Sequence, residues 1–285
     1  MIQDFIENHK LPVGETAEWL VDVIKSFPGL LNGIRSVILW IYTGFESFFL
    51  FFPPWLLIII IATIAYWSAK KVNLGLLTLL GLLLIWNLGY WENMIYTLSL
   101  VLSSALAAIL VGIPLGIWTA KSKIMYRIVT PVLDFMQTMP AFVYLIPVVT
   151  FFSIGEVPGI IASFIFAMPP TVRLTTLGIQ QVPAELVEAA NAFGTTSVQQ
   201  LFKVEIPLAK KTIMAGINQT IMLALSMVVI ASMVGAKGLG RDIFIAVSQI
   251  QVKIGVEAGL CIVILAILLD RITQSFGNRE PKLNK

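Results

Sequence analysis

The chain has 285 residues, of which 58% are hydrophobic and 12% are charged, and its mean hydropathy is +0.89. Soluble domains carry about 25% charged residues, roughly twice this fraction. A compact soluble fold of this size has too little interior to hide so many apolar side chains. The composition therefore excludes a soluble enzyme or nucleic-acid-binding protein and indicates an all-α polytopic membrane protein.

The residues that carry metal and thiol chemistry are scarce. The single cysteine, Cys261, lies in an apolar run, so we expect neither a disulfide framework nor a thiolate metal site. The single histidine, His9, cannot form an imidazole cluster. We therefore expect no catalytic residue, no metal site and no cofactor in this chain.

Two amphipathic segments come first along the chain. In Thr16–Ser26 and Leu30–Tyr42, apolar residues recur at helical spacing and polar residues occupy the opposite face. This pattern is typical of interfacial helices that lie on a membrane, although the second segment could instead begin a further span. We assign residues 1–46 to an N-terminal amphipathic scaffold segment.

Transmembrane helices are expected where about 20 consecutive residues are mostly apolar. About seven stretches approach this length, and the second is short: Phe48–Trp67, Leu74–Leu88, Met94–Ala120, Leu133–Phe152, Val157–Ile179, Thr212–Val234 and Ile254–Ile272. The first two form an accessory pair within residues 47–93. The last five form a core within residues 94–272, and residues 273–285 form a tail.

The basic residues of the connections predict the orientation, because cytoplasmic loops carry an excess of lysine and arginine. An outside N-terminus and a cytoplasmic C-terminus place six of the 19 basic residues outside. The other thirteen then face the cytoplasm: Lys70, Lys71, Lys121, Lys123, Arg127, Arg173, Lys203, Lys210, Lys211, Arg271, Arg279, Lys282 and Lys285.

One cytoplasmic connection, residues 180–211, is far longer than the others. Pro183 suits the start of a helix and Gly194 its end, and Thr195–Ser197 offer N-caps to a second short helix. Pro207 is expected to break the chain before the next span. The pattern predicts a helix–turn–helix that either meets a partner or lies against the membrane or the bundle.

Within this loop a motif stands at fixed spacing. Its residues are Glu188, Ala189, Ala190, Gly194, Ile206 and Pro207, with Val204 two residues before Ile206. The motif resembles the EAA–G–I–LP loop of ABC importer permeases. Three further strings resemble the quaternary-amine branch of that family, which contains the glycine betaine and proline betaine permeases: DFMQTMPAFVYLIP at 134–147, FAMPPTVR at 166–173, and GINQTIM at 216–222, which continues to SMVVIAS at 226–232.

The resemblance implies a type I importer fold with a five-helix core, and a role in osmoprotection by import of a compatible solute. It further implies a permease homodimer in the cell membrane, two ABC ATPase subunits that hold ATP and Mg, and a separate substrate-binding protein. The six motif residues would couple the chain to the ATPase. Permeases for choline or carnitine, and an ion-coupled secondary carrier, remain alternatives. No nucleic-acid partner is expected.

Polar and helix-breaking residues mark a candidate pore or gate: Met139, Pro140, Asn218, Gln219, Ser226 and Ser232. Polar side chains within a membrane usually face the bundle interior or an aqueous cavity. Hydrogen bonds between helices would explain the polar residues equally well, and a static kink would explain Pro140. Gly112 and Gly116 form a GxxxG pair, which favours close packing within the subunit over a dimer seam.

Overall fold

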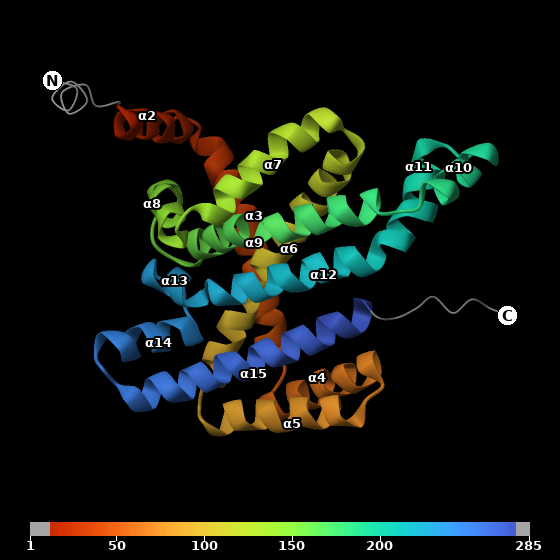
Figure 1. The fold of residues 1–285 in the computed structure, drawn as a ribbon. Helices are drawn as coiled ribbons and strands as arrows, with labels where there is room; N and C mark the ends of the chain where they lie inside the picture. Colours follow the sequence, from red (N-terminus) through yellow and green to blue (C-terminus); the bar gives the residue numbers. More distant parts are fainter. Residues whose placement is uncertain (1–11, 278–285) are drawn as a thin grey trace, which may run out of the picture.

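The computed structural model describes residues 12–277, and every regular element in this range is a helix (Figure 1). The elements are α2 (Val13–Lys25), α3 (Pro28–Phe51), α4 (Pro54–Ala69), α5 (Val72–Asn87), α6 (Trp91–Lys121), α7 (Lys123–Thr138), α8 (Ala141–Phe152), α9 (Glu156–Gln180), α10 (Ala184–Ala192), α11 (Ser197–Gln200), the π-helix η1 (Leu201–Glu205), α12 (Ile206–Ser226), α13 (Val228–Met233), α14 (Leu239–Ser248) and α15 (Val252–Gly277). The predicted all-α polytopic architecture is confirmed.

The number of candidate spans differs slightly from the predicted seven. Five described helices are long and apolar enough to cross a membrane: α3, α6, α9, the continuous stretch Ser197–Met233 and α15. The bent pair α7 and α8 would make a sixth. Helices α4 and α5 are apolar but have 16 residues each, fewer than the roughly 20 that a perpendicular crossing requires.

The N-terminal elements divide at a different place from the predicted one. Helix α3 contains the predicted interfacial segment Leu30–Tyr42 and is long and apolar enough to cross a membrane, which agrees with the alternative that this segment begins a further span. The expected boundary between residues 46 and 47 falls inside α3. The helix ends at Phe51 because Pro53 forces the preceding residue, Phe52, into an extended conformation. In Figure 1, α3 runs from top to bottom, across the left-to-right course of α9, α12 and α15.

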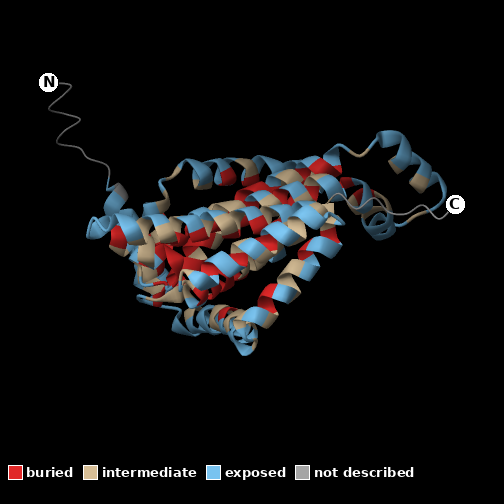
Figure 2. Cartoon of the chain, turned by 90° about the horizontal axis from the view of Figure 1, so that it is seen from below, coloured by how far each residue is buried: buried red, intermediate tan, exposed pale blue. Residues whose placement is uncertain are grey.

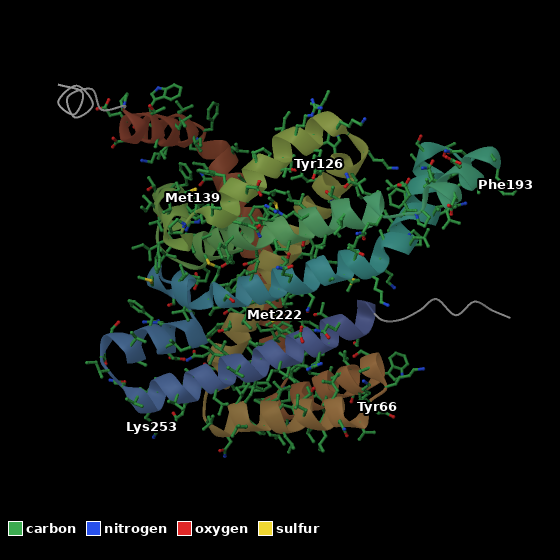
Figure 3. The ribbon with its side chains drawn as sticks, viewed as in Figure 1. Tyr66, Tyr126, Met139, Phe193, Met222 and Lys253 are labelled. Atoms are coloured by element: carbon green, nitrogen blue, oxygen red, sulfur yellow. The ribbon has the colours of Figure 1, made fainter. Side chains whose placement is uncertain are left out.

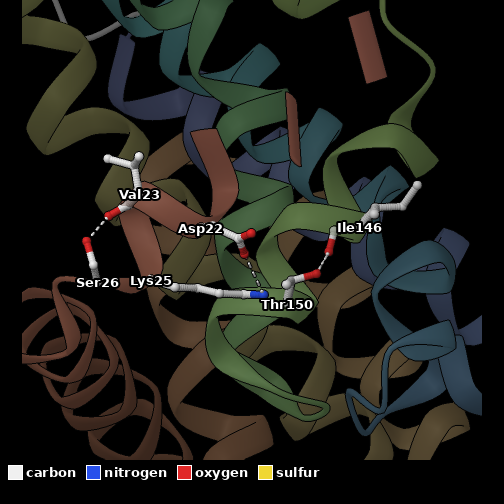
Figure 4. A network of polar contacts seen from close by, with 6 residues as sticks. All are labelled: Asp22, Val23, Lys25, Ser26, Ile146 and Thr150. Atoms are coloured by element: carbon white, nitrogen blue, oxygen red, sulfur yellow. Dashed lines mark hydrogen bonds and ion pairs between the residues drawn. The ribbon is translucent and has the colours of Figure 1, made fainter. Parts of the chain in front are cut away.

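Helix α2 remains a separate amphipathic helix, as expected. Its last turn carries an ion pair between Lys25 and Asp22 (3.5 Å), and the Ser26 hydroxyl donates to the carbonyl of Val23 at 2.5 Å (Figure 4). Residues 1–11 of the predicted scaffold segment and residues 278–285 of the predicted tail lie outside the described residues. The first residues of the predicted tail, 273–277, continue helix α15.

The predicted span Leu133–Phe152 is two helices, α7 and α8, at an angle of 100°. The bend lies at Met139 and Pro140, where the proline forces the residue before it out of the helical region (φ −68°, ψ 135°). The Tyr144 hydroxyl of α8 donates to the carbonyl of Met136 in α7, which closes the bend. The expectation that Pro140 breaks the helix is confirmed, and the break is sharper than a static kink, because α7 ends before Pro140 and α8 begins after it.

The core of the bundle forms where α6, α9 and α12 pack along one another through small residues. A Cβ on Gly112 would lie 2.9 Å from Cγ2 of Thr171, and one on Gly116 would lie 2.6 Å from Cβ of Thr175. The GxxxG pair therefore packs within the subunit, as favoured from the sequence. Figure 2 shows the buried residues concentrated in the middle of the bundle, whereas the loop at the far right is largely exposed.

Candidate functional site: the loop between α9 and α12 and the polar face of α12

Helix α10 begins and ends where its sequence requires. Pro183 occupies its N-cap, and Glu185 in its first turn complements the helix dipole. The chain then turns at Gly194, whose φ of +75° is costly for residues with a Cβ. Backbone N–H groups of Gly194 and Thr195 donate to the carbonyls of Asn191 (2.9 Å) and Ala190 (3.2 Å), as is common at helix ends.

A capping box starts the next helix. The Thr196 hydroxyl accepts from the backbone N–H of Gln199 (3.3 Å), and the Gln199 side chain accepts from the backbone N–H of Thr196 (3.0 Å). This reciprocal pair satisfies two N–H groups that lack helical partners. The predicted helix–turn–helix is therefore present, with Thr196 as the N-cap of the second helix.

Pro207 does not break the chain, contrary to the sequence prediction. The chain stays helical from Ser197 through Ser226, and Pro207 lies in the first turn of α12. The five-residue π-helix Leu201–Glu205 immediately precedes it, where the N–H of Ile206 donates to the carbonyl of Leu201. We attribute this to relief of the clash between a proline ring and the carbonyl four residues earlier, because a π turn is wider.

The six predicted coupling residues lie on the two sides of this turn. Glu188, Ala189 and Gly194 are exposed and Ala190 is half-buried on or directly after α10, whereas the half-buried Ile206 and the exposed Pro207 begin α12. No side chain of α10 is buried. Several large apolar side chains of the loop are exposed as well: Leu186, Phe193, Val198 and Phe202. Figure 3 shows Phe193 at the tip of the loop, pointing away from the bundle.

One loop residue that the sequence analysis missed is buried: Glu205, which is 3% exposed. Its Oε1 accepts from the Lys121 ammonium at the end of α6 (2.5 Å) and from the Gln200 amide at the end of α11 (2.7 Å). The sequence contains one signal for it, a carboxylate between the apolar residues Val204 and Ile206. That signal identifies a candidate buried acid but not its partner.

The candidate gate residues Met139 and Pro140 lie at the bend between α7 and α8. Met139 is half-buried and packs against a buried cluster that includes Tyr144 and Met227, which joins the bend to the end of α12. Pro140 is exposed. The arrangement gives the bend a rigid apolar support on one side and an open side at Pro140.

The polar residues of α12 and α13 separate into two groups. Asn218 and Gln219 line a cavity of about 510 Å³ between α12 and α15, together with Met214, Met222 and Gln274. The Asn218 amide donates to Oδ1 of Asp270 (2.7 Å), an acid on α15 that the sequence analysis did not single out. Ser226 and Ser232 are not brought into this cavity.

The second group is explained by hydrogen bonds to the backbone. The Ser226 hydroxyl donates to the carbonyl of Met222 in its own helix (3.0 Å). The Ser232 hydroxyl is buried and lies within hydrogen-bond distance of the carbonyls of Val229 (2.6 Å) and Gly240 (3.2 Å). For these two serines the structure favours the hydrogen-bonding interpretation over pore lining.

The opposite end of the bundle is closed by the turn before α14. The N–H of Leu239 donates to the Thr97 hydroxyl (2.8 Å), and the Asn93 amide donates to Oδ2 of Asp242 (2.6 Å). Burial raises the pKa of the Asp242 carboxyl, although the Asn93 hydrogen bond and the nearby Arg241 lower it. These bonds tie α14 to α6, so the turn has a structural role in the subunit.

Comparison with known proteins decides the family. A family model described as "binding-protein-dependent transport system inner membrane component" matches residues 112–280. The chain belongs to this family. Among the described residues, no group of three or more His, Cys, Asp or Glu side chains is placed to hold a metal ion.

Several relatives in this family match nearly the whole chain. The glycine betaine/carnitine transport permease protein GbuB of Listeria monocytogenes is 55% identical over 94% of this chain and 96% of its own length. The glycine betaine transport system permease protein OpuAB of Bacillus subtilis is 55% identical over 93% of this chain and 94% of its own length. The glycine betaine/proline betaine permease protein ProW of Escherichia coli is 48% identical over 93% of this chain and 74% of its own length.

Solved structures show the same fold. Two inward-facing structures of the MetNI methionine ABC transporter match with a TM-score of 0.58 at 22% and 23% identity. They cover 64% and 66% of this chain and 93% and 95% of their own chains. The predicted type I permease fold is thereby confirmed for the core of the bundle.

Proposed function

We propose that this chain is the membrane subunit of an ATP-driven importer of glycine betaine, proline betaine or a related quaternary amine. The relatives that match over nine-tenths of the chain are named for these solutes. The chain itself would perform no chemistry, because ATP and Mg would be held by a partner ATPase. Its task would be to form a passage and to couple that passage to the ATPase.

The exposed loop between α9 and α12 is the observation that carries this proposal. Phe193 is 89% exposed, and Val198 and Phe202 are 65% and 61% exposed, although all three are apolar. Exposed apolar groups gathered on one projecting loop are typical of an interaction site. An ATPase subunit that covers this loop would bury them, with Glu188 and Gly194 beside the contact.

The distribution of basic residues supports a cytoplasmic position for this loop. One cleft is lined by Lys70 and Lys71 of the α4–α5 turn together with Arg271 of α15, and Lys211 at the start of α12 lines the neighbouring cavity. The fold thus gathers basic residues from distant parts of the chain at the end that carries the loop. Because cytoplasmic loops are enriched in such residues, we propose that this end faces the cytoplasm.

The passage is proposed to lie at the interface of two copies of this chain, along the polar face of α12. Asn218 and Gln219 supply amide groups there, and Met139 and Pro140 at the α7–α8 bend are proposed to gate it. Each copy has one loop, so a homodimer would bind two ATPase subunits. Selection of the solute is assigned to a separate binding protein, because quaternary amines are recognised by aromatic cages through cation–π contacts.

Carnitine is a second candidate solute, since the name of one 55% identical relative includes it. Choline is less favoured, because the choline permease OpuBB of Bacillus subtilis is 31% identical over 62% of this chain. An ion-coupled secondary carrier is the least favoured, since the chain belongs to a binding-protein-dependent family.

The test is uptake of radiolabelled glycine betaine, carnitine or choline into vesicles that hold this chain, its ATPase and its binding protein. Glu188→Lys and Gly194→Asp should abolish ATP-dependent uptake without loss of inserted protein. Glu185→Lys is the matched control, because it reverses an exposed charge in the same helix but outside the motif. Uptake without ATP that is indifferent to both motif variants would contradict the importer assignment and favour a secondary carrier.

A further inference from the structure

Glu205 differs from every other residue between Gln181 and Ile206, because it alone is classed as buried. One of its carboxylate oxygens, Oε1, contacts both Lys121 (2.5 Å) and Gln200 (2.7 Å). The other oxygen, Oε2, is buried and has no hydrogen-bond partner within the described part of the chain. The side chain thus connects three elements: η1, the end of α11 and the end of α6.

The backbone around Glu205 presents it to α6. Glu205 is the last residue of the π-helix, and Lys121 is the last residue of α6. A lysine at the C-terminus of a helix is favoured by the helix dipole, so the end of α6 is a suitable place for this charge. The pair spans 84 positions of the chain, so it joins the loop to a helix far away in the sequence.

A contribution to folding stability does not by itself explain why Glu205 is buried beside Lys121. Burial of a carboxylate is costly unless both oxygens are satisfied, and here one oxygen has no partner among the described residues. Only the carboxylate is buried, because the Lys121 side chain is 43% exposed, and an ion pair that reaches solvent contributes little to stability. The distinct property of the pair is geometric, because it fixes the orientation of the loop relative to α6.

We propose that Glu205 is the positioning residue through which the loop moves α6. This rests on the proposed function, in which an ATPase displaces the loop. With Glu205 clamped to Lys121, displacement of α11 and η1 would carry the end of α6 with it. Helix α6 in turn packs closely on α9 at Gly112 and Gly116, where an added Cβ would lie less than 3.0 Å from atoms of α9. The pair would therefore transmit loop motion to the core of the bundle.

The experiment measures uptake and ATP hydrolysis by the complete importer with Glu205→Gln and Lys121→Met. Both variants should keep the KM for glycine betaine and retain the ATPase during purification, because neither residue lies at the loop tip. Uptake per ATP hydrolysed should fall about tenfold, within the range of coupling changes produced by residues between two communicating sites. Lys123→Met is the matched control, because it removes an exposed lysine two residues away.

The charge-exchanged double variant Lys121→Glu/Glu205→Lys distinguishes a specific pair from local damage, and it should recover much of the uptake per ATP. Unchanged coupling in both single variants would overturn the inference while leaving the importer function intact. Loss of folded protein in both single variants would assign the pair a purely structural role and would also overturn it. Absence of ATP-driven uptake in the unmodified importer would instead contradict the proposed function, and this inference with it.

Discussion

The α6–α9–α12 bundle and the loop between α9 and α12 differ in the surroundings of their small and apolar residues, which are tightly packed in the bundle and exposed in the loop. In the bundle, glycines such as Gly116 and Gly216 lie where a Cβ would press against a neighbouring helix, and the polar Thr171 and Thr220 are buried. In the loop, a Cβ on Gly194 would meet nothing within 4 Å, and Phe193 is almost fully exposed.

The small residues of the bundle and the exposed apolar residues of the loop therefore have different structural roles. Contacts inside the chain account for the small residues of the bundle, because the helices could not approach one another otherwise. Contacts inside the chain do not account for the apolar surface of the loop. Substitutions in the bundle should therefore lower the free energy of unfolding. Substitutions in the loop should instead weaken binding of the partner.

The largest expected effect on folding comes from Gly116→Val. A Cβ at this position would lie 2.6 Å from Cβ of Thr175 and 2.8 Å from the carbonyl oxygen of Val172, so α6 and α9 must move apart. We expect a loss of about 3 kcal/mol in unfolding free energy, the upper end of the usual range for overpacking. Denaturant unfolding of the purified chain in detergent measures it.

Gly259→Val is the matched control, because Gly259 lies within α15 and a Cβ there would meet nothing within 4 Å. It introduces the same β-branched side chain into a helix, so it carries the same intrinsic helix penalty. Equal destabilisation by the two variants would show that helix propensity, and not the contact of α6 with α9, limits the stability of the bundle.

A smaller loss of stability is expected for Thr220→Val. The hydroxyls of Thr220 and Thr171 share a buried hydrogen bond (2.6 Å), and Thr220 also lies 2.9 Å from the carbonyl oxygen of Ala167. Interhelical hydrogen bonds in membranes contribute about 1 kcal/mol, so we expect a loss of that order. A double-mutant cycle with Thr171→Val measures the coupling, and strictly additive losses would contradict a shared bond.

The bundle was easier to predict from the sequence than the N-terminal segment. Long apolar stretches bounded by charged or polar residues gave α6 and α9 to within about three residues at each end. Helix α3 was divided wrongly, because an amphipathic pattern and an apolar run follow each other without a breaker between them. The pair Pro53–Pro54 was the available signal, and it marks the true end of the helix.

The local structure of the loop was also largely predictable. Pro183, Gly194 and Thr196 act on neighbouring backbone groups, so their effects can be inferred from a few residues of sequence. The burial of Glu205 could not be inferred, because its partner Lys121 comes from a helix 84 positions away. The π-helix was missed because Pro207 suggested a break, whereas the wider π turn before it lets the helix continue past the proline ring.

At the loop turn, Gly194→Val should leave the bundle intact but impair coupling. The positive φ of this residue costs roughly 1–2 kcal/mol for most side chains with a Cβ, and that strain would shift the turn. Asparagine adopts this conformation more readily, so Gly194→Asn should retain more ATP-dependent uptake than Gly194→Val. Similar uptake by the two variants would show that the turn conformation is unimportant for coupling.

The smallest effect on folding is expected at the loop tip, for Phe193→Ser. An exposed side chain contributes little to the fold, so the change in unfolding free energy should stay within about 0.5 kcal/mol. Affinity for the ATPase should nevertheless fall, because an aromatic residue buried at an interface can contribute about 2 kcal/mol or more. Titration of the detergent-purified chain with the ATPase subunit measures this affinity.

Ile250→Ser provides the comparison for Phe193→Ser, because Ile250 is also apolar and is 86% exposed. Ile250 lies between α14 and α15, whereas Phe193 lies on the loop between α9 and α12. If exposure of an apolar side chain were enough to attract the ATPase, both variants would weaken binding. A loss of affinity confined to Phe193→Ser would locate the contact on the loop. Folding measurements cannot make this distinction, because Ile250→Ser also relieves the backbone strain of a β-branched residue at φ +54°.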